Sequence, residues 1–316
     1  MATNNTQVPF GVIADCFRNH SVVPFLGAAS SFVGVEGPQL PDARTLAATL
    51  AAKSNYPGSN DDPLTKVAQY LEEVAADRSF LLDEVTATFY SRIPDTYTSA
   101  LTAFLTAITS ESIPKLLITT NYDVTIERAL EARKVGYLAI SHIVGDSKYR
   151  GRLFCYDSLA GPGRIATLSQ INSDLVDENS NKHIKVVLYK IHGTARPSGL
   201  NERIDSVVLT EGDYIRFLTQ DTFRSIPIFI QERLRYSRLL YLGYSLQDWN
   251  FRVLLNRVRE MQRAGAKADE RRHWACLLNP DTVESRFWAK RGVEMYRSDL
   301  GTFLRELQLE LLGSPA

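Results

Sequence analysis

The sequence predicts an α/β protein in which a doubly wound parallel sheet carries an inserted helical subdomain. Two observations predict this class: short apolar segments of strand type recur along the chain, and longer segments of helical periodicity fall between them. Several of the short segments are apolar at nearly every position, which is typical of strands covered on both faces of a parallel sheet. Strands that alternate with helices in this way favour a doubly wound sheet.

Five segments are predicted as strands of this sheet. In chain order they are Val22 to Leu26, Leu116 to Thr119, Val186 to Tyr189, Leu239 to Leu242 and Trp274 to Leu278. The long intervals between them leave room for the helices that parallel connections require.

Apolar residues three and four positions apart predict the helices. Two of them run from Leu64 to Ala75 and from Ala100 to Ile108. A third follows the second strand behind a candidate N-cap at Asp123, and a fourth follows Asp248 in the same manner. The last helix is predicted from Asp299 to Leu312.

Two segments look like additions to the sheet. Residues 45–112 show only helical patterns, which predicts a helical insert between core segments 20–44 and 113–316 of a single domain spanning 1–316. The stretch from Gly145 to Lys182 is rich in Gly, Asn, Ser and Asp, so we expect a long surface excursion there.

Composition excludes several classes of protein. Lys plus Arg is 36 and Asp plus Glu is 36, so the chain is no polycation built for nucleic acid. The basic residues between Arg257 and Arg272 are interrupted by acidic ones, which favours a solvated helix face over direct nucleic-acid binding. Neither a membrane span nor a signal peptide is recognisable. Because Cys16, Cys155 and Cys276 are far apart, we expect no metal site and no disulfide, and a cytoplasmic protein.

The first predicted strand ends in a turn of small residues. It reads Gly27-Ala28-Ala29-Ser30-Ser31, so backbone N–H groups and hydroxyls can approach a phosphate. Taken alone, this motif is equally well explained as a tight connection between a strand and a helix.

Three further strands end in polar residues. The motifs are Thr119-Thr120-Asn121-Tyr122-Asp123, Lys190-Ile191-His192-Gly193 and Gly243-Tyr244-Ser245-Leu246-Gln247-Asp248. Each one is individually compatible with a cap or a simple loop, although His192 is well suited to proton transfer near neutral pH. Because the carboxyl ends of parallel strands meet at one edge of a sheet, we expect all four loops to converge on one crevice.

In this combination the chain resembles the sirtuin-like proteins, in particular the bacterial branch that cleaves NAD in antiphage defence. The family has a GAGxS-type phosphate turn, a TxNxD segment, a K-[IL]-HG segment and a GYSxxD segment in the same order, and this chain has Gly27 to Ser31, Thr119 to Asp123, Lys190 to Gly193 and Gly243 to Asp248. The segment from Phe287 to Asp299 is similar to the family's closing strand and helix. The resemblance extends from about residue 20 to 310 and implies a Rossmann-like NAD-binding core.

The resemblance also implies roles for individual residues. Asn121 would position the attacking water and the nicotinamide ribose, and His192 would hydrogen-bond the ribose hydroxyls and act as general base. Cofactor-binding residues would be Gly27, Ala28, Ala29, Ser30, Ser31, Thr120, Asp123, Gly193, Gly243, Tyr244 and Ser245. Within the turn, Ala29 stands where the family usually has Gly, which restricts backbone approach to the pyrophosphate.

The activity that the resemblance implies is NAD hydrolysis. The bond between C1′ and the nicotinamide nitrogen breaks, and water captures the oxocarbenium-like ribose, so NAD is the substrate. Protein-deacylating sirtuins carry a zinc domain with two cysteine pairs, and this chain has three cysteines and no such pair. Two alternatives stay open: an NAD-dependent deacylase or ADP-ribosyltransferase, and an NAD-binding scaffold subunit of a nucleic-acid-processing defence complex.

An enzyme that depletes NAD needs gating. We expect a homo-oligomer that resembles the sirtuin subunit of sirtuin–HerA systems, with a HerA-type hexameric ATPase as a separate partner chain. A short Argonaute protein is the other partner that the resemblance suggests. The Gly145 to Lys182 excursion and the helical insert are the expected contact surfaces.

Overall fold

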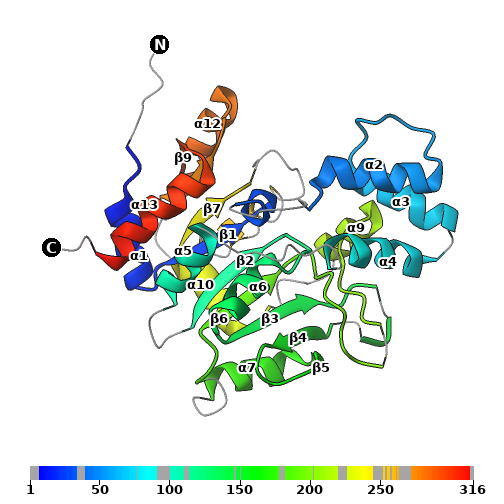
Figure 1. Cartoon of the computed structure of the whole chain (residues 1–316), viewed down its shortest axis with the longest axis horizontal. Helices are drawn as coiled ribbons and strands as arrows, with labels where there is room; N and C mark the ends of the chain where they lie inside the picture. Colours follow the sequence, from blue (N-terminus) through cyan, green and yellow to red (C-terminus); the bar gives the residue numbers. More distant parts are fainter. Residues whose placement is uncertain are drawn as a thin grey trace.

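The computed structural model describes residues 7–33, 40–75, 77–90, 100–109, 114–145, 147–149, 151–177, 182–201, 203–219, 226–244, 252, 255–256, 258–260, 262 and 272–313. Its centre is a nine-stranded sheet in the order β5-β4-β3-β6-β2-β1-β7-β8-β9 (Figure 1). All neighbouring strands are parallel except the β3–β4 and β4–β5 pairs. The predicted class, an α/β fold with a doubly wound, mostly parallel sheet, is confirmed.

The five predicted strands all exist, within one residue of their expected ends. They are β1 (Val22–Leu26), β2 (Lys115–Thr119), β6 (Val186–Lys190), β7 (Arg238–Leu242) and β8 (His273–Leu277). Every residue of β1, β2 and β6 is buried, as their continuous apolar character indicates.

Helices cover both faces of the sheet (Figure 1). One layer comprises α1 (Phe10–Arg18), α5 (Ala100–Ile108), α6 (Thr125–Ala132) and α13 (Leu300–Leu312). The opposite layer comprises α7 (Leu168–Val176), α9 (Glu211–Thr219), α10 (Ile228–Tyr236) and α12 (Thr282–Ala289). Side chains alternate between these layers along each strand, so Val23 and Phe25 enter one core and Val22 and Leu26 the other.

The chain order along the sheet changes direction between β1 and β7. From β1 the chain proceeds through β2 toward β6 and β3, whereas β7, β8 and β9 (Val293–Arg297) are added on the other side of β1. A crevice outside the strand ends forms at such a switch point, because adjacent connections leave in opposite directions. The four strands whose ends carry the predicted motifs, β6, β2, β1 and β7, are consecutive neighbours around this point.

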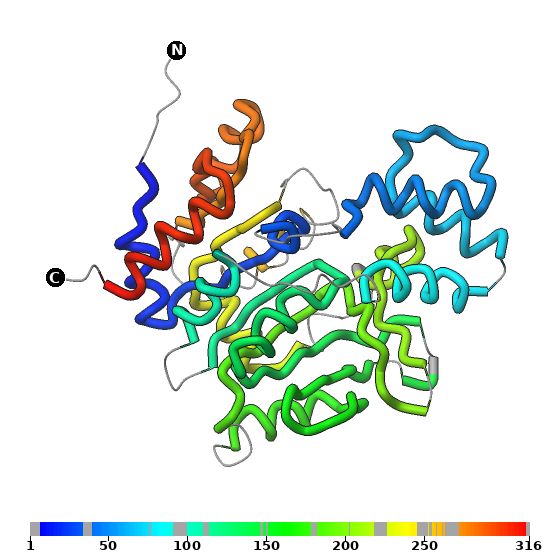
Figure 2. The backbone as a smooth tube through the Cα atoms, viewed as in Figure 1, coloured from blue at the N-terminus to red at the C-terminus, as the bar shows by residue number. Residues whose placement is uncertain are grey.

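Three helices lie together at one end of the molecule (Figure 2) and pack around a hydrophobic cluster that is separate from the two cores of the sheet. They are α2 (Ala43–Ser54), α3 (Leu64–Ala75) and α4 (Arg78–Phe89). This helical subdomain shares its core with Ala195, Val207 and Leu209 from the segment after β6. The fourth helix of the predicted insert, α5, packs instead against α13 and α6 on the sheet. The division of the chain into core and insert stays a prediction.

The expectation for residues 145–182 was wrong in part, because this stretch contains regular structure. Strands β4 (Leu153–Asp157) and β5 (Arg164–Ala166) extend the sheet in antiparallel fashion, beyond the unpredicted strand β3 (Tyr137–His142). Short strands at a sheet edge bury only part of their side chains, so their apolar signal is weak. The turn at Gly161 does exist between β4 and β5, with φ of +93°.

The C-terminal helix forms as predicted, since the Asp299 carboxylate accepts hydrogen bonds from the N–H groups of Gly301 and Thr302. The helix expected after Asp248 falls largely outside the described residues. Within the described part of the chain, no helix has both the length and the apolar character needed to cross a bilayer.

Candidate active site

The turn after β1 packs directly on the end of β7. The Gly27 N–H donates to Leu242 O at 2.8 Å, and a Cβ at Gly27 would lie 2.6 Å from Gly243 O. Gly243 adopts φ of +74°, and a Cβ there would lie 2.9 Å from Ser30 N. Both positions therefore require glycine, because the two backbones approach too closely for a side chain. Residues Ala28–Ser31 continue as a single turn of 3₁₀-helix, η1.

Asn121 links this turn to the end of β2. Its Nδ2 donates to Gly27 O at 3.0 Å and to the Ser31 hydroxyl at 2.8 Å. Its own backbone N–H donates to Thr119 Oγ1, which in turn donates to Leu26 O at 2.7 Å. Asn121 is only 7% exposed, so these bonds hold its amide in one place.

Asp123 continues the same buried network. Its Oδ2 accepts from the Ser31 hydroxyl at 2.8 Å, and its Oδ1 accepts from Thr125 N at 2.9 Å. The predicted N-cap at Asp123 was off by one residue, because α6 begins at Thr125 and its N-cap is Val124. Asp123 satisfies the first helical N–H from one position further out, and it fixes Ser31 with its other oxygen.

His192 lies two residues beyond β6, beside the loop that carries Asn121. Its ring centroid is 6.5 Å from that of Tyr122 and 5.2 Å from that of Tyr214, whose hydroxyl lies 3.4 Å from Nδ1. The side chain is 5% exposed, and burial lowers the pKa of His192 to about 4. The imidazole is therefore neutral near pH 7 and can accept a proton or a hydrogen bond.

The residue after this histidine explains how the loop turns. Gly193 has φ of +84°, and a Cβ at this position would lie 1.8 Å from Ser206 O. No other residue type fits this contact, so Gly193 lets the segment 207–209 return beside His192. Val208 N donates to His192 O at 3.0 Å, which fixes the histidine backbone.

The loop after β7 contributes Tyr244. Its hydroxyl lies 3.1 Å from Thr120 Oγ1, so the β7 loop also contacts the β2 loop. Ser245 and Asp248, predicted in the same motif, lie outside the described residues.

The structure thus brings the described members of all four motifs to one edge of the sheet, and they differ in exposure. Ala28 and Ala29 are exposed, and Thr120, Gly243 and Tyr244 are half-buried. Gly27, Ser30, Ser31, Asn121, Asp123, His192 and Gly193 are buried beneath them. The binding role expected of the Ser31 hydroxyl stays a prediction, and in this structure that hydroxyl donates to Asp123.

Several neighbours of the site were not identified from the sequence. Tyr122 belonged to a recognised motif, but Tyr214 is 22 residues from His192 and nothing in its surroundings marked it. Lys190 and Glu127 form a buried ion pair behind the Asn121 loop, and a buried pair of this kind has no signature in sequence. His142 is buried and its Nε2 lies 2.7 Å from the Tyr189 hydroxyl. Among the described residues, no group of three or more His, Cys, Asp or Glu side chains is arranged to hold a metal ion.

No curated protein matches the chain. A solved structure described as "Structural Basis for the Mechanism and Regulation of Sir2 Enzymes" is similar over 97% of this chain and 98% of its own, at 12% identity and a TM-score of 0.45.

The family comparison is more direct. The profile of the family described as "SIR2-like domain" matches residues 115–296, more than half of the chain. This span begins with β2 and includes the Asn121, His192 and Gly243 loops. The chain therefore belongs to the SIR2-like domain family, and its activity is accordingly that of an NAD-dependent enzyme.

Proposed function

We propose that this protein is an NAD glycohydrolase that cleaves NAD to nicotinamide and ADP-ribose. The observation that carries the proposal is the position of Asn121. Its amide joins the β1 turn to the β2 loop at the switch point of the sheet, and the neutral imidazole of His192 lies near the adjacent Tyr122. An amide held rigidly in a loop that lies beside a proton acceptor suits a reaction in which water attacks a ribose carbon.

The gradient of exposure suggests how NAD would lie. The exposed residues Ala28 and Ala29 would lie against the pyrophosphate, since they open a turn at the end of a parallel strand. Tyr244 and Thr120 would contact the adenosine half, and the nicotinamide ribose would enter toward Asn121 and His192.

The proposed reaction would use two side chains, those of Asn121 and His192, and one water. As the bond between C1′ and the nicotinamide nitrogen breaks, positive charge develops on the ribose. Asn121 would hold the water, and His192 would hydrogen-bond the ribose hydroxyls and accept the proton that the water loses. Burial keeps His192 unprotonated at neutral pH, and a pKa of about 4 also makes it a weaker base than an exposed imidazole.

We further propose that the enzyme acts in the cytoplasm of a bacterium as an antiphage effector, gated by homo-oligomerisation or by a HerA-type ATPase. Short Argonaute proteins are the other partner class. Gating by a partner fits an enzyme whose unrestrained activity would deplete the cell's own NAD.

The test is nicotinamide release from NAD by the wild-type protein and by the Asn121→Ala and His192→Ala variants, each with and without candidate partners. Wild-type turnover that falls about 10²–10⁴-fold in both variants is the expected result. Turnover only in the presence of a partner would add gating by assembly.

Three outcomes would replace the proposal. NAD binding without turnover under all conditions would favour a scaffold subunit. Nicotinamide release that requires an acyl-lysine peptide would favour a deacylase, and ADP-ribose attached to a protein would favour a transferase.

A further inference from the structure

Behind the Asn121 loop lies a pair of charges that is almost completely shielded from solvent. Lys190 is the last residue of β6, and Glu127 lies in the first turn of α6. Their side chains are each 1% exposed, and Lys190 Nζ lies 2.8 Å from Glu127 Oε1. Burying two charges is costly, so a pair in such a place needs a reason beyond stability.

The contacts of Lys190 supply that reason. Besides Glu127, its ammonium group donates a hydrogen bond to the backbone carbonyl of Asp123. Asp123 is the residue that fixes Ser31, and Ser31 accepts from the Asn121 amide. Lys190 therefore supports the proposed catalytic loop from the side opposite to the β1 turn.

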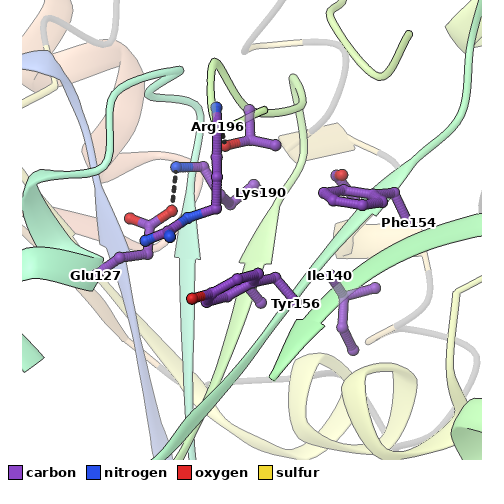
Figure 3. Close-up of a pocket in the computed structure, with 9 residues that line it drawn as sticks. Glu127, Ile140, Phe154, Tyr156, Lys190 and Arg196 are labelled. Atoms are coloured by element: carbon purple, nitrogen blue, oxygen red, sulfur yellow. Dashed lines mark hydrogen bonds and ion pairs between the residues drawn. The ribbon is translucent and has the colours of Figure 1, made fainter. Parts of the chain in front are cut away.

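One oxygen of the Glu127 carboxylate, Oε1, accepts the hydrogen bond from Lys190. The other, Oε2, is buried and has no hydrogen-bond partner among the described residues. The same holds for Ser141 Oγ and Arg196 Nε. All three residues line one small cavity between α6 and the sheet (Figure 3).

Another charged residue that lines this cavity, Arg196, is held firmly. The Arg196 guanidinium stacks on the Tyr156 ring at 4.1 Å from its centroid and donates to Glu131 Oε1 at 3.0 Å, as Figure 3 shows in part. Arg196 is therefore paired with Glu131, whereas Glu127, whose negative charge also acts on Arg196, is the hydrogen-bonded partner of Lys190.

We propose that Lys190 is a positioning residue that holds the Asp123 carbonyl, and with it Asn121, and that Glu127 is retained to keep the buried ammonium group in place. The catalytic consequence rests on the proposed NAD hydrolysis. The structural consequence, that Lys190 holds the loop after β2 in place, does not depend on the proposed activity.

Variants of Lys190 and Glu127 should change stability and kcat in opposite ways, and this contrast tests the proposal. The double variant Lys190→Met/Glu127→Leu removes both charges and leaves no unpaired ion, so it should fold with little loss of stability. It should nevertheless lose at least tenfold in kcat for nicotinamide release, because nothing holds the Asp123 carbonyl. Glu127→Gln should do the reverse: its amide oxygen can still accept the hydrogen bond from Lys190 Nζ and keep that group beside the Asp123 carbonyl, so most of kcat is retained, while the loss of the counter-charge destabilises the fold.

Lys115→Met is the matched control. Lys115 is also buried, and it begins the neighbouring strand β2, at the opposite edge of the sheet, where its Nζ donates to Phe17 O at 2.8 Å. This variant should lose stability and keep wild-type kcat when assayed well below its unfolding temperature.

Hydrogen exchange provides a readout that does not depend on activity. The Asn121 and Thr125 amides, which are bonded within the β2 loop, should exchange at least tenfold faster in the double variant and at the wild-type rate in Lys115→Met. A double variant with wild-type kcat and wild-type exchange overturns the inference. If the wild-type protein releases no nicotinamide at all, the proposed function fails, and the exchange rates alone decide this inference.

Discussion

Two histidines of this molecule share nearly the same surroundings and differ in where the backbone places them. His142 and His192 are 6% and 5% exposed, and burial lowers the pKa of each to about 4. Each faces a tyrosine hydroxyl, and each ring lies about 6.5 Å from the same Phe217 ring. His142, however, is the last residue of β3 and is paired in register with Leu153 of β4.

His192 instead follows β6 and sits in the loop that Gly193 turns. Its hydroxyl partner is farther away, at 3.4 Å against 2.7 Å for His142. The comparison teaches that burial and pKa alone do not identify a catalytic histidine. Both lie at the carboxyl ends of parallel strands, β3 and β6, but only β6 borders β2, which brings His192 beside Tyr122 of the Asn121 loop, and the proposed catalytic role is given to His192 on that ground.

The largest expected effect separates the two residues by activity. His192→Gln should reduce NAD cleavage by about 10²–10⁴-fold, because the proton acceptor is removed while the size of the side chain is kept. His142→Gln should leave kcat within about twofold. The measurement is steady-state nicotinamide release by both variants. A similar loss of kcat in both would mean that the two histidines do not differ in their role in catalysis.

The next largest expected effect is a loss of stability at acidic pH, to which both histidines should contribute. In the unfolded chain each histidine titrates near 6.5, whereas in the folded protein its pKa is about 4. Between these values the unfolded state binds more protons, so stability falls as the pH is lowered from 6.5 toward 4. Each histidine should cost about 2 kcal/mol of unfolding free energy at pH 5 relative to pH 7.5.

Urea unfolding at the two pH values measures this dependence. His142→Gln and His192→Gln should each reduce the acid sensitivity of the wild-type protein by about that amount. A variant as acid-sensitive as the wild type would mean that its histidine is not buried in the neutral form.

The smallest effect concerns the two hydroxyls. Tyr189→Phe removes a buried 2.7 Å hydrogen bond and should cost about 1 kcal/mol of stability without a change in kcat. Tyr214→Phe should cost less stability, because its 3.4 Å contact is longer, and should lower kcat several-fold by freeing the His192 ring. Thermal unfolding and kinetics of the pair check this, and the reverse pattern would exchange the roles of the two histidines.

Much of the fold was predictable because a parallel sheet buried on both faces makes its strands apolar throughout. This held for β1 and for the central residues of β2 and β6, which carry Lys115 and Lys190 at one end, and the limits of all three were expected within one residue. It did not hold for β4 and β5, which lie at the antiparallel edge and bury only some of their residues. The paired partner that stabilises such strands is specified by tertiary structure.

For the site, the sequence indicated the loops and their common edge, because topology alone brings strand ends together. It did not indicate contacts between residues far apart in the chain, such as Tyr214 with His192 or Lys190 with Glu127. Lysine and glutamate are expected at the surface on general grounds, so their burial at the base of the site could only be seen in three dimensions.

The shared core of the helical subdomain limits how this protein can be dissected. Ala195, Val207 and Leu209 belong to the segment that supports His192, yet their apolar partners are in α2, α3 and α4. Deleting these helices would expose that apolar surface to water and release the segment 207–209, which fixes the histidine backbone. The helical subdomain is therefore no detachable module, and a minimal catalytic fragment of this chain has to retain it.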